Sequence, residues 1–268
     1  MTGLAASPLG LIIGLLLGTL GGGGSVLAVP VLVYVVGQTP QAATSTSLVI
    51  VALTALGGLV GHLRAGNVRV GAGMALGLAG AGGSVAGSHI NLLMPPRALL
   101  ITFAVLMIVA AAGMLRRHSA PETAVHEWRA TGGGTATVER TRMTSSTVTR
   151  VLIAGTVVGL LTGLFGVGGG FVIVPVLVLV LGFAMPDAVG TSLVVIALNA
   201  VTALAARMAG GGHIDWSVAW PFTIAGLVGV VLGTALVKRI PAERLTRAFA
   251  VLLIVVAAWM TVDAVIGA

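Results

Sequence analysis

The stretch Gly14-Leu-Leu-Leu-Gly18-Thr-Leu-Gly21-Gly-Gly-Gly-Ser25, with Val29-Pro30 just after it, occurs a second time in this chain. The second copy is Gly159-Leu-Leu-Thr-Gly163-Leu-Phe-Gly166-Val-Gly-Gly-Gly170 with Val174-Pro175, 145 residues later. Sixteen residues after each proline stands the same tripeptide, as Thr46-Ser47-Leu48 and as Thr191-Ser192-Leu193. The chain is therefore predicted to hold two copies of one module, each opening with an apolar helix that glycines interrupt. This combination is typical of transporters of small solutes.

The similarity between the two halves continues beyond this motif. Gly66-Asn67-Val68-Arg69 aligns with Gly212-His213-Ile214-Asp215 at an offset of 146, which one inserted residue explains. We predict an all-α polytopic membrane protein of two homologous repeats, with four apolar segments in each. The predicted units are the membrane repeat 1–115, a polar cytoplasmic linker 116–149 with a short helix around Glu122–Ala130, and the membrane repeat 150–268.

The composition excludes a soluble domain. Of 268 residues, 57% are apolar and only 8% are charged, and so large an apolar surface could not be kept in water. The apolar stretches are long and nearly uncharged, as in bilayer-spanning helices, and the net charge of +7 fits basic loops. The absence of cysteine excludes disulfides and thiolate metal sites, and residues 1–25 lack the basic start of a cleaved signal peptide. The predicted apolar segments are 8–36, 44–62, 70–90, 98–115, 150–181, 187–207, 216–237 and 243–267.

The first apolar segment of each half allows two shapes. Its glycines split it into two pieces that each suit half a bilayer, so it is either one broken, tilted crossing or a re-entrant hairpin. With four crossings per half, one side of the membrane holds nine basic residues and the other five. With hairpins the division is twelve against two. This cleaner bias favours hairpins, inverted repeats, both termini outside and a cytoplasmic linker.

The two glycine tracts form the centre of the predicted binding site. Unwound main chain inside a bilayer is costly unless it is buried in protein or lines a wet cavity. The half-helix that begins after each tract is expected to present amide groups and the positive end of its dipole, an arrangement that binds anions. No carboxylate lies in the middle of a predicted span, where cation carriers usually need one. The sequence therefore favours a small anion as substrate.

Polar side chains near the tracts complete the candidate site, and each has a second interpretation. The Thr and Ser hydroxyls of the repeated tripeptide either contact substrate or cap their helices. His62 and Arg207, at equivalent positions, either neutralise the charge of the substrate or extend to the membrane surface. Asn199 either contacts substrate or makes an interhelical hydrogen bond. The predicted substrate-binding residues are Gly21, Gly23, Gly24, Ser25, Thr46, Ser47, His62, Gly166, Gly168, Gly169, Gly170, Thr191, Ser192, Asn199 and Arg207.

The doubled order of glycine tract, Val-Pro and Thr-Ser-Leu resembles the sulfite exporter TauE/SafE family. The resemblance covers residues 8–262, in both halves, and includes Pro30 and Pro175. It implies a permease of the bacterial inner membrane for sulfur-containing anions such as sulfite and sulfonates. The family often has a His near the exit of the second helix of a half, followed by Gly-x-[Val/Ile]-Asp. This chain keeps His62 but has Arg69 in place of that Asp, and in the second half it has Arg207 in place of the His but keeps Asp215.

We expect a secondary permease or exporter that moves small sulfur-containing oxyanions, such as sulfite or organosulfonates, by alternating access. A passive anion channel and a permease for another small organic anion are the alternatives. The sequence has no His-Glu-x-x-His cluster, so we expect no enzymatic activity, no metal and no cofactor. The expected partners are the anionic substrate and the lipid bilayer, not nucleic acid, and a homo-oligomer is left open.

Overall fold

The computed structural model describes residues 7–117, 145–166, 170–179, 181–237 and 241–266. In these ranges it is helical and contains no strand. The helix expected around Glu122–Ala130, like most of the linker, lies outside the described residues. The elements are α2 (Ser7–Leu20), the 3₁₀ helix η1 (Gly21–Leu27), α3 (Ala28–Tyr34), α4 (Pro40–Arg64), α5 (Val70–Leu93), α6 (Pro96–Arg117), α8 (Ser145–Phe165), α9 (Gly170–Leu179), α10 (Met185–Ala209), α11 (Trp216–Val237) and α12 (Ala242–Ile266).

The architecture is that of a polytopic membrane protein. Five helices, α4, α5, α6, α10 and α11, are long and apolar enough to cross a bilayer, judged by length and composition over the described residues. Large apolar side chains also face outward, such as Leu78 on α5 and Val231 on α11, each 63% exposed. A soluble protein seldom exposes so many of them, whereas lipid tails would cover them at no cost.

The first apolar segment turns back on itself at its glycines. α2 ends at Leu20, and the next residue, Gly21, has a φ of 61° that is readily adopted only by glycine. The chain continues as η1 and then α3. A Cβ placed on Gly24 would lie 2.5 Å from the Cα of Leu17, so η1 packs directly against the helix it has just left. The glycine tract thus interrupts the helix where the sequence predicts an interruption.

Helix directions show that the chain reverses at this interruption. α2 and α4 both run the same way along α11, so η1 and α3 must carry the chain back between them. The contacts that fix these directions are Gly10–Phe222 and Gly18–Val230 for α2, and Thr54–Gly226 and Gly61–Thr234 for α4.

The second half has the same arrangement around Gly166, whose φ is 66°. α8 and α10 run the same way along α5, with Gly159–Gly80 and Gly163–Ser84 contacts for α8, and Gly73–Val194 and Ser88–Ala203 contacts for α10. α4 and α10 run in opposite directions, because Arg207 near the end of α10 bonds to Thr44 near the start of α4, whereas Leu193 near the start of α10 lies beside Gly58 late in α4.

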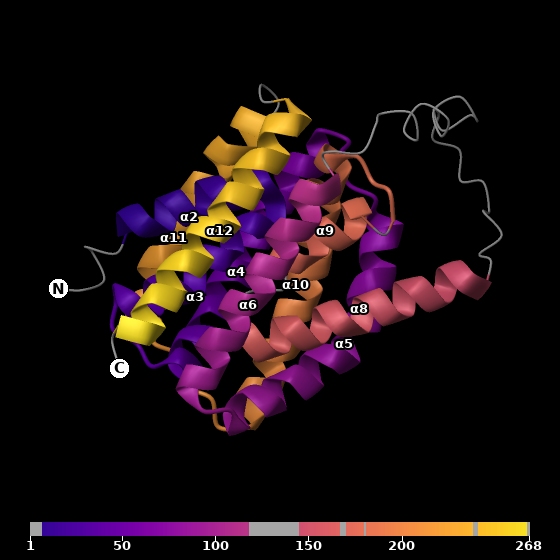
Figure 1. Ribbon diagram of the computed structural model, residues 1–268. Helices are drawn as coiled ribbons and strands as arrows, with labels where there is room; N and C mark the ends of the chain where they lie inside the picture. The colour runs from indigo at the N-terminus through magenta and orange to yellow at the C-terminus, as the bar shows by residue number, and fades with distance from the viewer. Residues whose placement is uncertain (1–6, 118–144, 167–169, 180, 238–240, 267–268) are drawn as a thin grey trace, which may run out of the picture.

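The leading helix of each half packs on the third helix of the other half. Figure 1 shows α2 beside α11 and α5 beside α8. At the first crossing, a Cβ on Gly14 would lie 2.7 Å from the Cα of Gly226; at the second, a Cβ on Gly159 would lie 2.7 Å from the Cα of Gly80. Glycines thus line the close contacts at both crossings, and neither half makes its closest packing alone.

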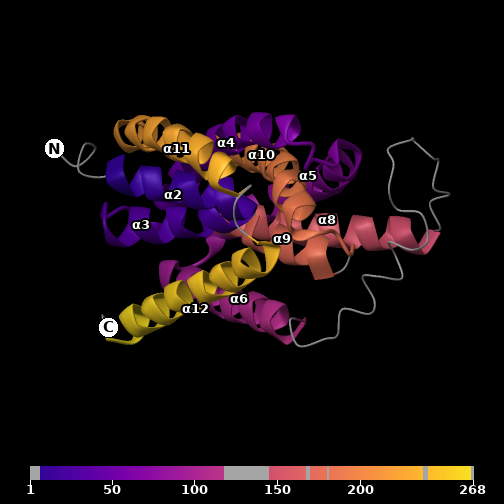
Figure 2. The same cartoon turned by 90° about the horizontal axis from the view of Figure 1, so that it is seen from above.

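The remaining long helices, α6 and α12, lie side by side along one flank of the molecule (Figure 2). Aromatic contacts tie them to the hairpins. Tyr34, the last residue of α3, packs against Trp259 on α12 with ring centroids 4.8 Å apart. Phe103 on α6 packs against Phe165, the last residue of α8, at 5.1 Å. The chain reversals are therefore held inside the protein, where interrupted main chain can be tolerated.

Candidate functional site

Each glycine break packs against the Thr-Ser-Leu helix of the opposite half. A Cβ on Gly21 would lie 2.8 Å from the Ser192 hydroxyl and 2.9 Å from the Cα of Val189, both on α10. A Cβ on Gly166 would lie 2.6 Å from the Cα of Thr44 on α4. Sequence analysis placed the breaks and the tripeptides in one site, and the structure brings them together across the two halves.

The serines of the tripeptides hold main-chain carbonyls near these breaks. Ser47 donates a short hydrogen bond to the carbonyl of Gly166 and another, of 3.1 Å, to that of Thr44. Ser192 donates to the carbonyl of Val189 at 2.7 Å. All of these side chains are fully buried. Ser47 therefore fixes the main chain at the very residue where α8 stops.

The threonines of the tripeptides bind loop amides instead. Thr46 accepts a hydrogen bond of 3.2 Å from the amide of Asp215, and Thr191 accepts one of 3.0 Å from the amide of Arg69. Asp215 and Arg69 precede α11 and α5, so each threonine ties its helix to a loop of the other half.

The helix-capping interpretation of these four hydroxyls is wrong. They lie more than one turn inside α4 and α10, where main-chain amides already have helical partners. Thr39 occupies the N-cap of α4 and accepts from the amide of Ala42 at 3.4 Å. Ala184 occupies that of α10 without any side-chain cap.

Arg207 is the largest fully buried side chain among the described residues, with 0% of its surface exposed. One guanidinium nitrogen donates to the hydroxyls of Thr44, at 2.5 Å, and Ser45, at 3.5 Å. The other donates to the carbonyls of Gly163, at 2.5 Å, and Leu164, at 3.5 Å. These carbonyls belong to the last turn of α8, where carbonyl oxygens lack helical N–H donors and the helix dipole has its negative end.

His62 makes the corresponding contact in the other half. It is 1% exposed, and its Nε2 lies 3.1 Å from the carbonyl oxygen of Gly18 in the last turn of α2. Snorkelling to the membrane surface, the alternative considered for both residues, is therefore wrong. Their side chains point inward because the ends of α2 and α8 offer carbonyl acceptors that no water can reach.

The charge of Arg207 is not balanced by a carboxylate. Within the described ranges it forms no ion pair, and its hydrogen-bond acceptors are two hydroxyls and two carbonyls, all neutral. An ion pair elsewhere, Arg69–Asp187 at 2.9 Å, joins two partly exposed side chains at the helix ends. A buried cation without a counter-ion is expensive, so the arrangement is suited to receive an anion.

Asn199 lies two turns before Arg207 on α10 and is also fully buried. Neither its amide oxygen nor its amide nitrogen has a hydrogen-bond partner, and both lie close to Gly80 on α5. The interhelical hydrogen bond considered for Asn199 is therefore not formed. Thr54, at the corresponding position of α4, donates to the carbonyl of Ile50 at 2.6 Å.

The other predicted residues lie in or next to the two breaks. Gly23 and Gly24 lie in η1, Ser25 is buried there, and Gly170 begins α9. Gly168 and Gly169 lie outside the described residues. In the part of the chain that is described, no group of three or more His, Cys, Asp or Glu side chains could hold a metal ion.

Sequence reasoning missed one polar face of α5. Ser84, Ser88 and Asn91 recur at helical spacing and are fully buried against α8 and α10. Ser88 donates to the carbonyl of Ala203, and Asn91 donates to that of Leu164, which also faces Arg207. The signal was the spacing of three and four residues between polar side chains in an otherwise apolar span.

A cavity of about 270 Å³ lies elsewhere, between α4 and α11, and contains none of the predicted site residues. In the conformation described, the breaks and Arg207 are closely packed.

Comparison with known proteins identifies the family. The sequence model of the sulfite exporter TauE/SafE family matches residues 6–260. The chain belongs to this family. It is 36% identical over 254 residues to a "probable membrane transporter protein" of Xylella fastidiosa (strain Temecula1), covering 93% of this chain and 91% of that protein. It is 27% identical over 257 residues to the "probable membrane transporter protein YunE" of Bacillus subtilis, covering 91% and 93%. No solved structure gives a significant match.

The resemblance seen in the sequence is thus confirmed. Family membership and the names of these relatives support a membrane transporter, and the apolar helices agree with a multi-pass bacterial membrane protein.

Proposed function

We propose that this TauE/SafE-family protein is a secondary transporter of small sulfur-containing oxyanions, such as sulfite or organosulfonates, and that it works by alternating access. The observation that carries the proposal is the buried guanidinium of Arg207, which has neutral acceptors and no carboxylate. An oxyanion entering between α4, α8 and α10 would replace those acceptors and supply the missing negative charge. Guanidinium donors match the oxygens of an oxyanion in geometry as well as in charge.

The direction of the helices supports inverted repeats, with the first segment of each half as a re-entrant hairpin. The chain reverses at Gly21 and again at Gly166, and corresponding helices run in opposite directions. With this topology the basic loops gather on the linker side, which we assign to the cytoplasm, with both termini outside. Two hairpins of opposite orientation suit a site that opens to one side at a time.

The substrate class rests on the family description, sulfite exporter. Asn199 adds an unpaired amide near the same polar face, able to donate to or accept from a substrate oxygen. The export direction enters the proposal through the family name.

Flux measurements in proteoliposomes test the proposed function. Vesicles loaded with sulfite should release it at a rate that saturates with concentration, and external unlabelled sulfite should drive counterflow of labelled sulfite. An ohmic anion current in a planar bilayer, together with the absence of counterflow, would instead indicate a passive anion channel. Saturable flux of a small carboxylate but not of sulfite would move the assignment to another organic anion.

Binding can be tested separately from flux. A panel of sulfite, sulfate, thiosulfate, small sulfonates and carboxylates is added to the purified protein while its Tm is measured. A ligand that binds only the folded protein raises the Tm, by an amount that grows with ligand concentration. If no anion in the panel raises the Tm, the proposed substrate class is wrong.

A further inference from the structure

The groove between the C-terminal halves of α4 and α11 is a second site with its own chemistry. Its cavity, of about 270 Å³, is lined from α4 by Gly57, Val60, Gly61 and Arg64 and from α11 by Val231, Thr234 and Ala235. We propose that this groove binds an anionic phospholipid, with the phosphate on Arg64 and one acyl chain along the glycines. The site is independent of the proposed transport function.

The walls of the groove belong to the lipid-facing surface. Val60 is 49% exposed and Val231 is 63% exposed, and their outward neighbours Leu63 and Leu232 are 46% and 51% exposed. Gly57 and Gly61 carry no side chains, so α11 packs close to this part of α4: an added Cβ on Gly57 would meet Leu227, and one on Gly61 would lie 3.0 Å from the Thr234 hydroxyl. The groove lies beside this contact and is lined by both glycines. An apolar groove of this kind contacts hydrocarbon in the membrane.

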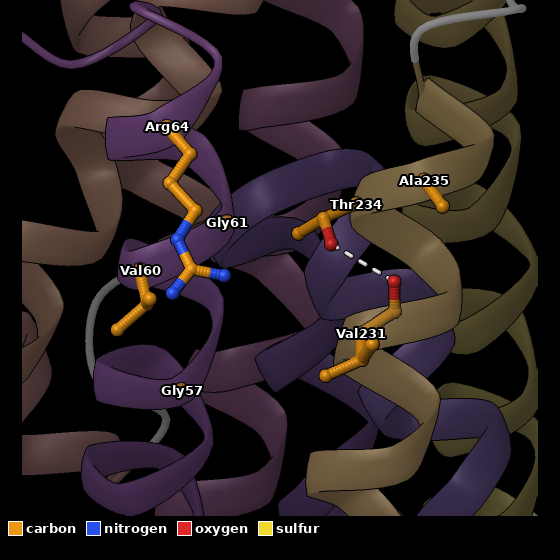
Figure 3. A pocket seen from close by; sticks show the side chains of 7 residues that line it. All are labelled: Gly57, Val60, Gly61, Arg64, Val231, Thr234 and Ala235. Carbon is orange, nitrogen blue, oxygen red and sulfur yellow. Dashed lines mark hydrogen bonds between the residues drawn. The ribbon is translucent and has the colours of Figure 1, made fainter.

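Arg64 gives the groove a charged end. It is the last residue of α4, where a spanning helix reaches headgroup depth. Figure 3 shows its side chain turned back along α4, toward the level of Gly61 and into the groove. Within the described ranges Arg64 makes no ion pair, and the Thr234 hydroxyl opposite it donates to the carbonyl of Val231 on its own helix. The guanidinium therefore has room for an anion.

The corresponding surface of the other half lacks these features. Positions 145 residues further on place Thr202, Ala206 and Ala209 where α4 has Gly57, Gly61 and Arg64. On α5, Ser88 stands opposite and donates to the carbonyl of Ala203 on α10. Side chains thus fill the floor, and there is no cation at the end. The groove is a property of these particular residues and not of the repeated architecture.

The two parts of the groove together select a lipid rather than a free anion. A phosphate ion or a small oxyanion would be bound by Arg64 alone and would leave the apolar walls unused. Gly57 lies seven residues before Arg64, about 10 Å deeper along the helix, which corresponds to the upper part of an acyl chain below its headgroup. An anionic phospholipid fills both parts at once.

The test uses full-length protein purified in detergent and depleted of lipid. Phosphatidylglycerol and phosphatidylcholine with identical acyl chains are titrated in, and glycerol phosphate is titrated as the free anion. Bound lipid is counted by native mass spectrometry, and the Tm is followed in parallel. The variants are Arg64→Ala, Arg64→Lys and Ala235→Leu, which fills the groove from its exposed rim; Arg97→Ala, an exposed arginine elsewhere, is the control.

Phosphatidylglycerol should bind as a retained adduct and raise the Tm, with phosphatidylcholine clearly weaker. Arg64→Ala should weaken phosphatidylglycerol binding roughly five- to tenfold, as expected for one basic group at an anionic headgroup. Ala235→Leu should weaken binding although the charge is intact, Arg64→Lys should restore part of it, and Arg97→Ala should leave it unchanged. The proposal is overturned by equal adducts in Arg64→Ala and wild type, by an equal response to glycerol phosphate, or by a dimer mass that replaces the lipid adduct.

Discussion

The guanidinium of Arg207 donates a hydrogen bond of 2.5 Å to the carbonyl oxygen of Gly163, three residues before the chain reverses at Gly166. The positive side chain of Arg207, from α10, thus supplies hydrogen-bond donors to the carbonyls at the C-terminus of α8. His62 and Gly18 make the matching contact in the other half. The two halves thus place different groups, a guanidinium and an imidazole, at corresponding positions, so the two ends of the site differ in chemistry.

Replacing Arg207 tests whether its charge serves transport or packing. Arg207→Gln loses hydrogen bonds to carbonyls but also removes a costly buried charge, so the free energy of unfolding should change by only about 1–2 kcal/mol. Sulfite flux should fall at least about tenfold, equivalent to 1.4 kcal/mol, and the anion-induced rise in Tm should disappear. Arg207→Lys should recover part of the flux. An undiminished Tm response to sulfite in Arg207→Gln would remove this residue from the binding site.

The two break glycines should be more sensitive to substitution than other glycines with positive φ. Gly21→Ala and Gly166→Ala combine an unfavourable backbone conformation with a close approach to the opposite half, and each should cost about 2–4 kcal/mol. Gly37→Ala is the matched control, because Gly37 has a φ of 79° but nothing within 4 Å of its added Cβ; it should cost about 1 kcal/mol. If the three variants lower the Tm by the same amount, close packing at the breaks does not contribute to stability.

The double variant Ser47→Ala, Ser192→Ala should weaken transport more than folding. Each hydroxyl makes buried hydrogen bonds to carbonyls, and the net loss should be about 1 kcal/mol per serine. Thr102→Ala is the control, since Thr102 bonds to a carbonyl on an exposed face of α6. Unchanged sulfite flux in the double variant, at normal expression, would confine both serines to a packing role.

Asn199→Leu should separate stability from function. Since neither amide atom has a partner, replacing the side chain by an apolar one of similar size should leave the Tm unchanged or raise it. Transport should nevertheless fall if the amide meets substrate. Thr54→Val, at the corresponding position, is the comparison, and it should affect neither quantity strongly. A Tm drop of several degrees in Asn199→Leu would mean that the Asn199 amide has hydrogen-bond partners in the membrane-embedded protein, contrary to this prediction.

Asp215 makes the start of α11 sensitive to acid. Its pKa is lowered from 3.8, chiefly by the hydrogen bond from the Ser217 hydroxyl and also by one from Gln38. A carboxyl whose pKa is lower in the folded state stabilises the fold above its unfolded pKa, and this contribution is lost as the pH falls through the folded value. The Tm difference between wild type and Asp215→Asn should therefore be constant near neutral pH and shrink below about pH 4. A difference that grows on acidification would contradict this assignment.

Much of the fold could be predicted from the sequence, because lipid imposes simple rules. Apolar length located the helices, and the glycine tracts located the breaks at Gly21 and Gly166. The partners of polar side chains could not be predicted in the same way. They depend on which helix ends meet: Arg207 turns inward because α8 ends beside it, and Thr46 binds an amide of a loop far away in sequence. Neither relationship leaves a trace in local spacing.

The packing of α2 against α11 sets an order of events during biosynthesis. The first helix to leave the ribosome has its closest partner near the other end of the chain, at Phe222, Gly226 and Val230. Until α11 has been made, the glycine face of α2 has only provisional neighbours in the membrane or the insertion machinery. A messenger truncated after α10 would therefore produce a chain in which that face of α2 lacks its partner helix.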